Sequence, residues 1–129
     1  MQGDLAARNG GKVLAVEFEP WVLFAKITGK ADVEANGYTI TDGGEVIASA
    51  VRAAEGQITL TLGQKWAALL GVDFDCSIND QIFVVTANTV STDKTISVTC
   101  RPHGDSGCAD TDPDAAVIGM RIWVKNLNQ

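Results

Sequence analysis

The segment from Arg101 to Asp114, RPHGDSGCADTDPD, carries most of the residue types in this chain that could perform chemistry. It contains His103, the only histidine, together with Cys108, and Cys100 immediately precedes it. These three residues, with Cys76 as a further candidate, have the ligand chemistry of a zinc site. The paired C-x2-C spacing of a zinc knuckle is missing, however, so we predict no metal site and no cofactor.

Three aspartates in the same segment imitate the opening of a calcium loop, namely Asp110, Asp112 and Asp114. Such a loop needs a bidentate glutamate at its twelfth position, where this chain has Arg121, and Pro113 stands where a ligand or a turn residue belongs. We interpret the segment as an exposed acidic turn, with Pro113 stiffening the entry to the last strand. A looser carboxylate site for a cation is the alternative.

Nucleophilic catalysis would have to combine His103 with Cys108, because no G-x-S-x-G nucleophile turn occurs in the chain. The intervening run from Gly104 to Gly107 is typical of a flexible loop, which positions reacting groups poorly. We therefore predict no catalytic residues. A small hydrolytic or metal-binding β domain stays open as an alternative.

The three tryptophans, Trp21, Trp66 and Trp123, could form a binding surface or pack in the core. Trp123 lies out of phase with the apolar residues of the final strand and is expected to face outward. An exposed tryptophan beside Met120 and Ile122 would suit a protein interface. The candidate interface residues are therefore Trp123, Met120, Ile122 and Trp21.

Length and charge limit the classes of protein to which the chain can belong. Its 129 residues, 46% of them hydrophobic, suffice for one core, and 10 Lys plus Arg against 16 Asp plus Glu give a net charge of −6. That sign disfavours nucleic acid as a partner and suits contact with a basic protein surface. No apolar run is long enough to span a membrane, and no signal peptide is recognisable at residues 1–8. Three cysteines cannot all pair, which favours a reducing cytoplasm, although a Cys76–Cys100 or Cys100–Cys108 bridge stays open.

The elements that must position these residues are mostly short strands. Alternation of Ile58, Leu60 and Leu62 with threonines predicts a half-buried strand. The same alternation recurs in 94–101 and 116–126. Together with short apolar runs bounded by turn residues, it predicts strands over 12–18, 21–28, 45–52, 57–62, 74–78, 81–87, 94–101 and 116–126. The stretch 29–44 is expected to be loop and short hairpin. Trp66, Leu69 and Leu70 at helical spacing before Gly71 predict one short helix over 64–70.

This pattern predicts an all-β fold, mainly an antiparallel β-sandwich or a jelly-roll-like barrel with one short helix. We expect a single β domain over 12–129, preceded by a flexible N-terminal arm over 1–11.

Three motifs resemble a known class of protein. They are GQITLTL at 56–62, KWAALL at 65–70, and ADTDPDAA at 109–116 before an alternating strand that ends in VKN. In this order, between Gly56 and Asn126, they resemble small virion proteins of tailed bacteriophages, of the capsid cement or decoration type.

The resemblance implies a β domain that docks on the outside of a capsid, commonly as a trimer, and strengthens the shell. Expected partners are the major capsid protein or another virion protein, and the expected location is the virion, after synthesis in the host cytoplasm. A phage tail or receptor-binding module is the alternative, with Trp21 or Tyr38 in a groove that binds a carbohydrate of the host surface.

Overall fold

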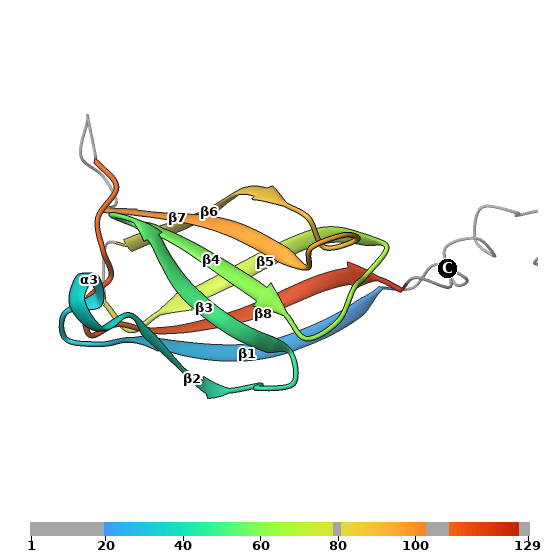
Figure 1. The fold of residues 1–129 in the computed structure, drawn as a ribbon, viewed down its shortest axis with the longest axis horizontal. Coiled ribbons are helices and arrows are strands. Elements are labelled where there is room, and N and C mark those ends of the chain that lie inside the picture. Colours follow the sequence, from blue (N-terminus) through green and yellow to red (C-terminus); the bar gives the residue numbers. More distant parts are fainter. Residues whose placement is uncertain (1–19, 79–80, 103–108, 127–129) are drawn as a thin grey trace, which may run out of the picture.

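The computed structural model describes residues 20–78, 81–102 and 109–126, and these residues form two packed layers of strands (Figure 1). Several sequence-based predictions lie outside the described residues: the arm over 1–11, the strand over 12–18, and the pair His103 and Cys108.

The fold is an all-β sandwich, as predicted, and not a closed barrel. Its first layer, sheet I, has the strand order β2-β1-β8-β5, and its second, sheet II, the order β3-β4-β7-β6. All the pairings within the sheets are antiparallel. The strands are β1 (Trp21–Gly29), β2 (Tyr38–Asp42), β3 (Ile47–Ala54), β4 (Gln57–Leu62), β5 (Ala68–Cys76), β6 (Gln81–Asn88), β7 (Thr95–Pro102) and β8 (Val117–Lys125).

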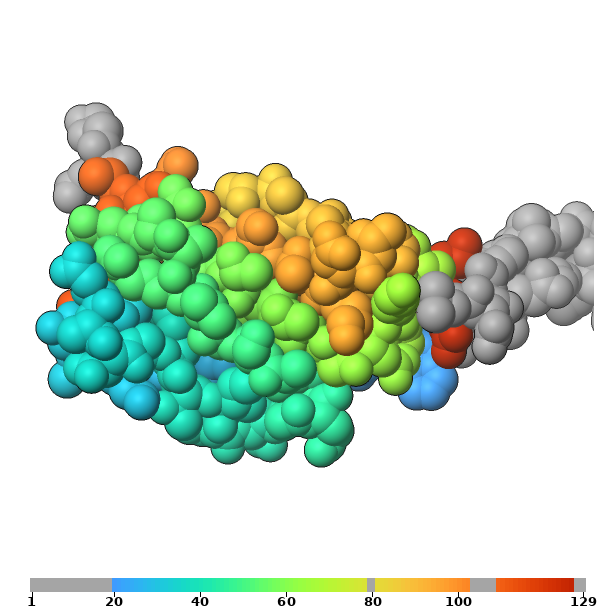
Figure 2. All heavy atoms as spheres, in the orientation of Figure 1, coloured from blue at the N-terminus to red at the C-terminus, as the bar shows by residue number. Residues whose placement is uncertain are grey.

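The core lies between the sheets because the central strands alternate apolar and polar residues. Inward positions of β4, β7 and β8 are almost fully buried, and each large aliphatic side chain there contributes roughly 1.5 to 3 kcal/mol. They are Ile58, Leu60, Leu62, Ile96, Val98, Ile118, Met120, Ile122 and Val124. Figure 2 views the molecule on the outer face of sheet II, where side chains of β3, β4, β6 and β7 form a continuous surface.

The hairpin of β3 and β4 confirms the clearest sequence-based prediction. Its turn contains Gly56 at φ +69°, a left-handed conformation that glycine adopts readily. A Cβ at this position would collide with the backbone nitrogen of Thr111, so a second segment approaches the turn closely.

The helix predicted over 64–70 is wrong. Residues 63–67 form bends and irregular chain, and β5 begins at Ala68. The helical spacing misled because the three apolar residues face different ways: Trp66 is buried, Leu69 packs against the core from β5, and Leu70 is exposed. Cross-strand bonding prevails here, since the Ala67 amide donates to the Lys125 carbonyl at 2.8 Å.

A short helix instead occurs at α3 (Val33–Asn36), in the stretch that the sequence assigned to loop and hairpin. Asp32 caps it, since its side chain accepts a hydrogen bond from the Ala35 amide at 3.1 Å. Within the described ranges, no helix has the length and apolar character needed to cross a membrane.

Candidate functional site

The structure divides the four predicted interface residues into two pairs. Met120 and Ile122 are 5% and 0% exposed and point into the core, so their assignment to an interface is wrong. Both occupy inward positions of β8, a central strand of sheet I, and the opposite sheet covers them. Trp123 occupies an outward position and is half-buried, and Trp21 is 52% exposed at the start of β1.

Trp123 belongs to a row of apolar side chains that crosses the outer face of sheet I. Val22 lies directly opposite it on β1, and Gly71 lies opposite it on β5, next to the exposed Leu70 in a β-bulge. Phe24, two residues beyond Val22 on the same face, is 63% exposed. We call Val22, Phe24, Leu70 and Trp123 the apolar row. It is contiguous because its members lie on three neighbouring strands.

A hollow of about 470 Å³ borders the apolar row at Phe24. Its floor includes Gly119 of β8, which has no side chain, and its walls include Lys26 on one side and Asp75 on the other. Nearby, Arg121 pairs with Asp73 at 3.7 Å, and both side chains are more than half exposed. The outer face of sheet I therefore combines exposed apolar side chains with charged groups of both signs.

The outer face of sheet II differs. Its exposed apolar residues, Val51 on β3 and Ile82 and Val84 on β6, lie on the two edge strands. Threonines and serines of β4 and β7, paired as Thr59 with Ser97 and Thr61 with Thr95, lie between the two edges. Ile82 and Val84 adjoin along β6, but among the described residues of this face no apolar row crosses neighbouring strands.

The three aspartates of the ADTDPD segment each bind a different part of the sandwich. We call residues 109–116 the aspartate strap. Asp112 accepts hydrogen bonds from the Arg52 guanidinium at 3.0 Å and from the Gly56 amide at 2.8 Å, and its side chain is only 11% exposed. The strap is thereby fastened to the β3–β4 turn of sheet II.

The neighbouring aspartates fasten the strap elsewhere. Asp114 accepts from the Val33 amide of α3 at 2.9 Å. Asp110 accepts from the Arg101 guanidinium at 2.9 Å and from the Gln57 side-chain amide at 3.3 Å, and these hydrogen bonds lower its pKa. Among the described residues, no three Asp, Glu, Cys or His side chains are grouped as metal ligands would be. The segment predicted to be an exposed acidic turn is a partly buried connector between the two sheets.

Two groups near the strap have raised pKa values. Burial raises the pKa of the Cys100 thiol to about 12, and the charges of Asp112 and Asp110 add to this effect. Burial also raises the pKa of Tyr38, with further contributions from Asp112 and Asp114. Both side chains are therefore neutral over the physiological pH range.

The cysteines within the described residues are free thiols. Cys100 is fully buried, on the apolar face as predicted, and donates to the side-chain oxygen of Gln81 at 2.9 Å. Cys76, which is half-buried on β5, is also a free thiol. The Cys76–Cys100 bridge left open by the sequence is therefore not formed. Cys108 and His103, the other residues of the predicted zinc and catalytic alternatives, lie outside the described residues.

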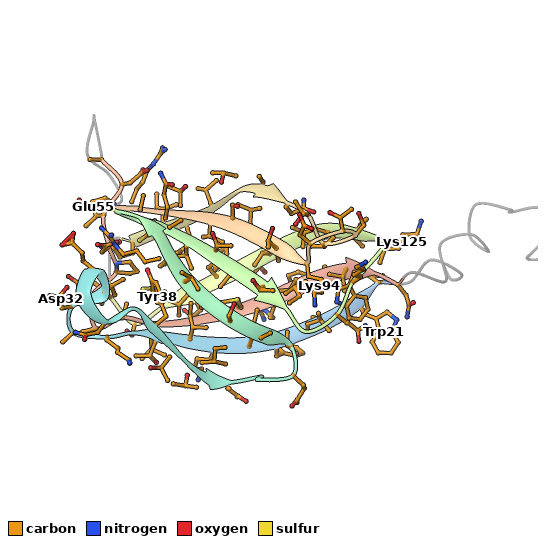
Figure 3. The ribbon with its side chains drawn as sticks, viewed as in Figure 1. Trp21, Asp32, Tyr38, Glu55, Lys94 and Lys125 are labelled. Carbon is orange, nitrogen blue, oxygen red and sulfur yellow. The ribbon has the colours of Figure 1, made fainter. Side chains whose placement is uncertain are left out.

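A second concave region lies at the opposite end of the sandwich from the strap. It is a groove of about 360 Å³ lined by Trp21, Leu23, Glu45, Val46, Gln64, Trp66 and Asn126. The Trp21 and Trp66 rings lie with their centroids 6.0 Å apart and their planes tilted by 48°. Figure 3 shows Trp21 projecting at this end, whereas Tyr38, Asp32 and Glu55 lie toward the other. Trp21 and Tyr38 therefore cannot share one groove.

Sequence reasoning missed the pairing of Trp21 with Trp66 and the roles of the strap aspartates. Both depend on contacts between residues far apart in the chain, such as the 60 positions that separate Arg52 from Asp112. No family model matches the sequence, and the searches of curated proteins and of solved structures give no match either.

Proposed function

We propose that this chain is a non-enzymatic structural protein of a tailed-bacteriophage virion, which docks on the capsid shell as a cement or decoration protein. The resemblance of residues 56–126 to such proteins suggests this class, and the apolar row on sheet I supports a role in docking. The proposed partner is the major capsid protein or another virion protein.

The observation that carries the proposal is the contiguity of the apolar row. Exposed apolar residues scattered singly are normal on a protein surface, but neighbouring ones mark interaction sites. Val22, Phe24 and Trp123 lie on adjacent strands of one face. Burying a side chain such as Phe24 against a partner would contribute roughly 1.5 to 3 kcal/mol.

Charge suits the same proposal. The net charge of −6 favours contact with a basic protein surface. Charges of both signs surround the apolar row, namely Lys26 and Arg121 together with Asp73 and Asp75. These side chains would surround the apolar contact with polar groups, as is usual at protein interfaces.

The experiment is co-sedimentation of the purified protein with empty capsid shells of the phage that encodes it. We expect the protein to pellet with the shells and to saturate at a fixed ratio to the capsid protein. Phe24→Asp should reduce the affinity at least about tenfold, because it places a charge in the apolar contact.

The matched control is Val51→Asp, an equally exposed apolar position on the outer face of sheet II. We expect it to bind shells like the unmodified protein. The docking proposal fails if the unmodified protein stays in the supernatant, or if Val51→Asp weakens binding as much as Phe24→Asp. Light scattering after size exclusion tests the homotrimer separately, since a mass of three chains supports it and the mass of one chain refutes it.

A tail or receptor-binding module is the second candidate, and the groove at Trp21 is the observation that favours it. Failure to bind shells combined with binding of a host glycan would select this candidate over the first.

A further inference from the structure

We propose that the groove at the Trp21 end of the sandwich is a binding site for a neutral carbohydrate chain, with Trp21 as the platform on which a sugar ring stacks. The inference rests on the second candidate function, for which it names the class of ligand, and it does not rest on docking to a capsid. The groove lies at one end of the sandwich, between loops, whereas the apolar row lies on the outer face of sheet I.

Trp21 has the exposure that a stacking platform needs. Half of its surface is open, and its ring projects from the end of the sandwich (Figure 3). A sugar ring has one face of C–H groups, which packs well on the electron-rich face of an indole.

The platform is held in place by Trp66. This second tryptophan is 6% exposed, and its amide donates to the Val90 carbonyl at 2.9 Å. Its ring contacts that of Trp21, which limits the orientations open to the exposed indole. A ligand binding there would therefore find an ordered surface, and little conformational entropy would be lost on binding.

Polar side chains surround the platform. Gly63 approaches the Glu45 carbonyl so closely that a Cβ at Gly63 would collide with it, and the Gly63 amide donates to the Val46 carbonyl at 2.9 Å. This contact joins the β2–β3 loop to the segment before β5. It thereby places Glu45 and Gln64, from two distant parts of the chain, on the rim of one groove.

The chemistry of the rim fits hydroxyl groups. The Glu45 carboxylate accepts hydrogen bonds, and the Gln64 amide both donates and accepts them. Sugar hydroxyls do both as well. The groove volume of about 360 Å³ lies within the range of small-molecule sites, about 300–1,000 Å³, and its lining of aromatic, aliphatic and a few polar residues is typical of them.

Charge argues for a neutral sugar. Glu45 is the single charged side chain among the described residues that line the groove, and it would repel the carboxylates of acidic sugars. A lone ammonium group over Trp21 would satisfy Glu45 but would leave the Gln64 amide without a role.

The test is titration of the full chain with a panel of neutral oligosaccharides built from glucose, galactose, mannose, N-acetylglucosamine or rhamnose. Binding is followed by tryptophan fluorescence and by saturation-transfer NMR. We expect at least one member to bind with a Kd of about 1 mM or below. Trp21→Ala should weaken that binding at least about tenfold, whereas Trp21→Phe should retain part of it because an aromatic face remains.

Two further variants separate the site from a general loss of folding. Glu45→Gln and Gln64→Ala change exposed side chains and should weaken sugar binding several-fold with unchanged thermal unfolding. The matched control is Glu55→Gln, an exposed glutamate at the opposite end of the sandwich, which should bind like the unmodified protein.

Three results would overturn the proposal. The first is that no member of the panel binds. The second is that Glu55→Gln weakens binding as much as Glu45→Gln. The third is that tetramethylammonium or a lysine amide binds at Trp21 and the sugars do not, which would identify a site for cations.

Discussion

The two ends of the sandwich use similar polar residues for opposite purposes. At the strap end, the carboxylates of Asp110, Asp112 and Asp114 accept hydrogen bonds from residues of other elements. At the Trp21 end, Glu45 and Gln64 are exposed on the rim of a groove beside an open indole. The type of residue therefore does not distinguish a structural role from a proposed binding role. The presence of hydrogen-bond partners within the chain does.

Burial explains the difference in energetic terms. A largely buried carboxylate such as Asp112 must be paired, because an unpaired one would lose its hydration without compensation. An exposed carboxylate such as Glu45 keeps its hydration and can exchange it for a ligand. Substitutions at the strap end should therefore change stability, and those at the groove should change stability little.

The largest effect is expected at Gly56. Gly56→Ala forces a Cβ onto the Thr111 backbone and a left-handed φ onto alanine, and should lower the free energy of unfolding by about 3 kcal/mol or more. Urea unfolding measures this loss. The control is Gly44→Ala, where φ is not positive and nothing lies within 4 Å of the added atom, so that a change below about 0.5 kcal/mol is expected. Equal losses at both positions would show that the strap does not constrain the turn.

A smaller loss is expected at Asp112. Asp112→Ala removes the acceptor for the Arg52 guanidinium and the Gly56 amide in a largely buried setting, and should cost about 2 to 3 kcal/mol in urea unfolding. Asp110→Ala is the comparison, because its partner Arg101 is mostly exposed and solvent screens the pair. A larger loss at Asp110 than at Asp112 would contradict this account.

Alkaline pH should lower the free energy of unfolding through groups near the aspartate strap. The folded-state pKa of Cys100 is raised to about 12 from 9.0, so the neutral thiol is favoured in the folded protein. The contribution of the neutral thiol to the free energy of unfolding is complete below the unfolded-state pKa. It declines as pH rises from about 9 to about 12, by about 1.4 kcal/mol per pH unit. Tyr38 acts with the same sign. Unfolding measured at about pH 8 and about pH 10 should show the decline, and Cys100→Ala should reduce it. If the free energy of unfolding declined equally in Cys100→Ala, the alkaline loss of stability could not be attributed to Cys100.

The smallest effect is expected at the groove rim. Glu45→Ala and Gln64→Ala should each change the free energy of unfolding by less than about 0.5 kcal/mol, because both side chains are exposed. Thermal unfolding followed by circular dichroism checks this. A loss above about 1 kcal/mol at either position would mean that the rim supports the fold, as the strap does.

Much of the fold could be predicted from local pattern. Period-two alternation identified β4, β7 and β8, short apolar runs between turn residues identified β1 and β6, and turn glycines identified the β3–β4 hairpin. The start of β5 could not be predicted in this way, because Trp66, Leu69 and Leu70 have helical spacing in the sequence. Their placement depends on bonds to Val90 and Lys125, which lie far along the chain.

The candidate site was less predictable. Trp123 was placed outward correctly from its phase in β8, yet the same phase puts Met120 and Ile122 inside, as their alternation already indicated. The apolar row required knowledge that β5 and β1 flank β8. The groove required the pairing of Trp21 with Trp66, and no local pattern contains that information.

The placement of β1 beside β8 has a mechanical consequence. The two strands run antiparallel with Trp21 opposite Val124, so residues 20 and 126 leave the sandwich side by side. Tension applied between these two points would open the β1–β8 ladder one hydrogen bond at a time, as a zipper opens. Tension entering through the outer face of sheet I would load many bonds of the ladder together. A subunit that reinforces a pressurised shell would therefore bear load better through this face than through residues 20 and 126.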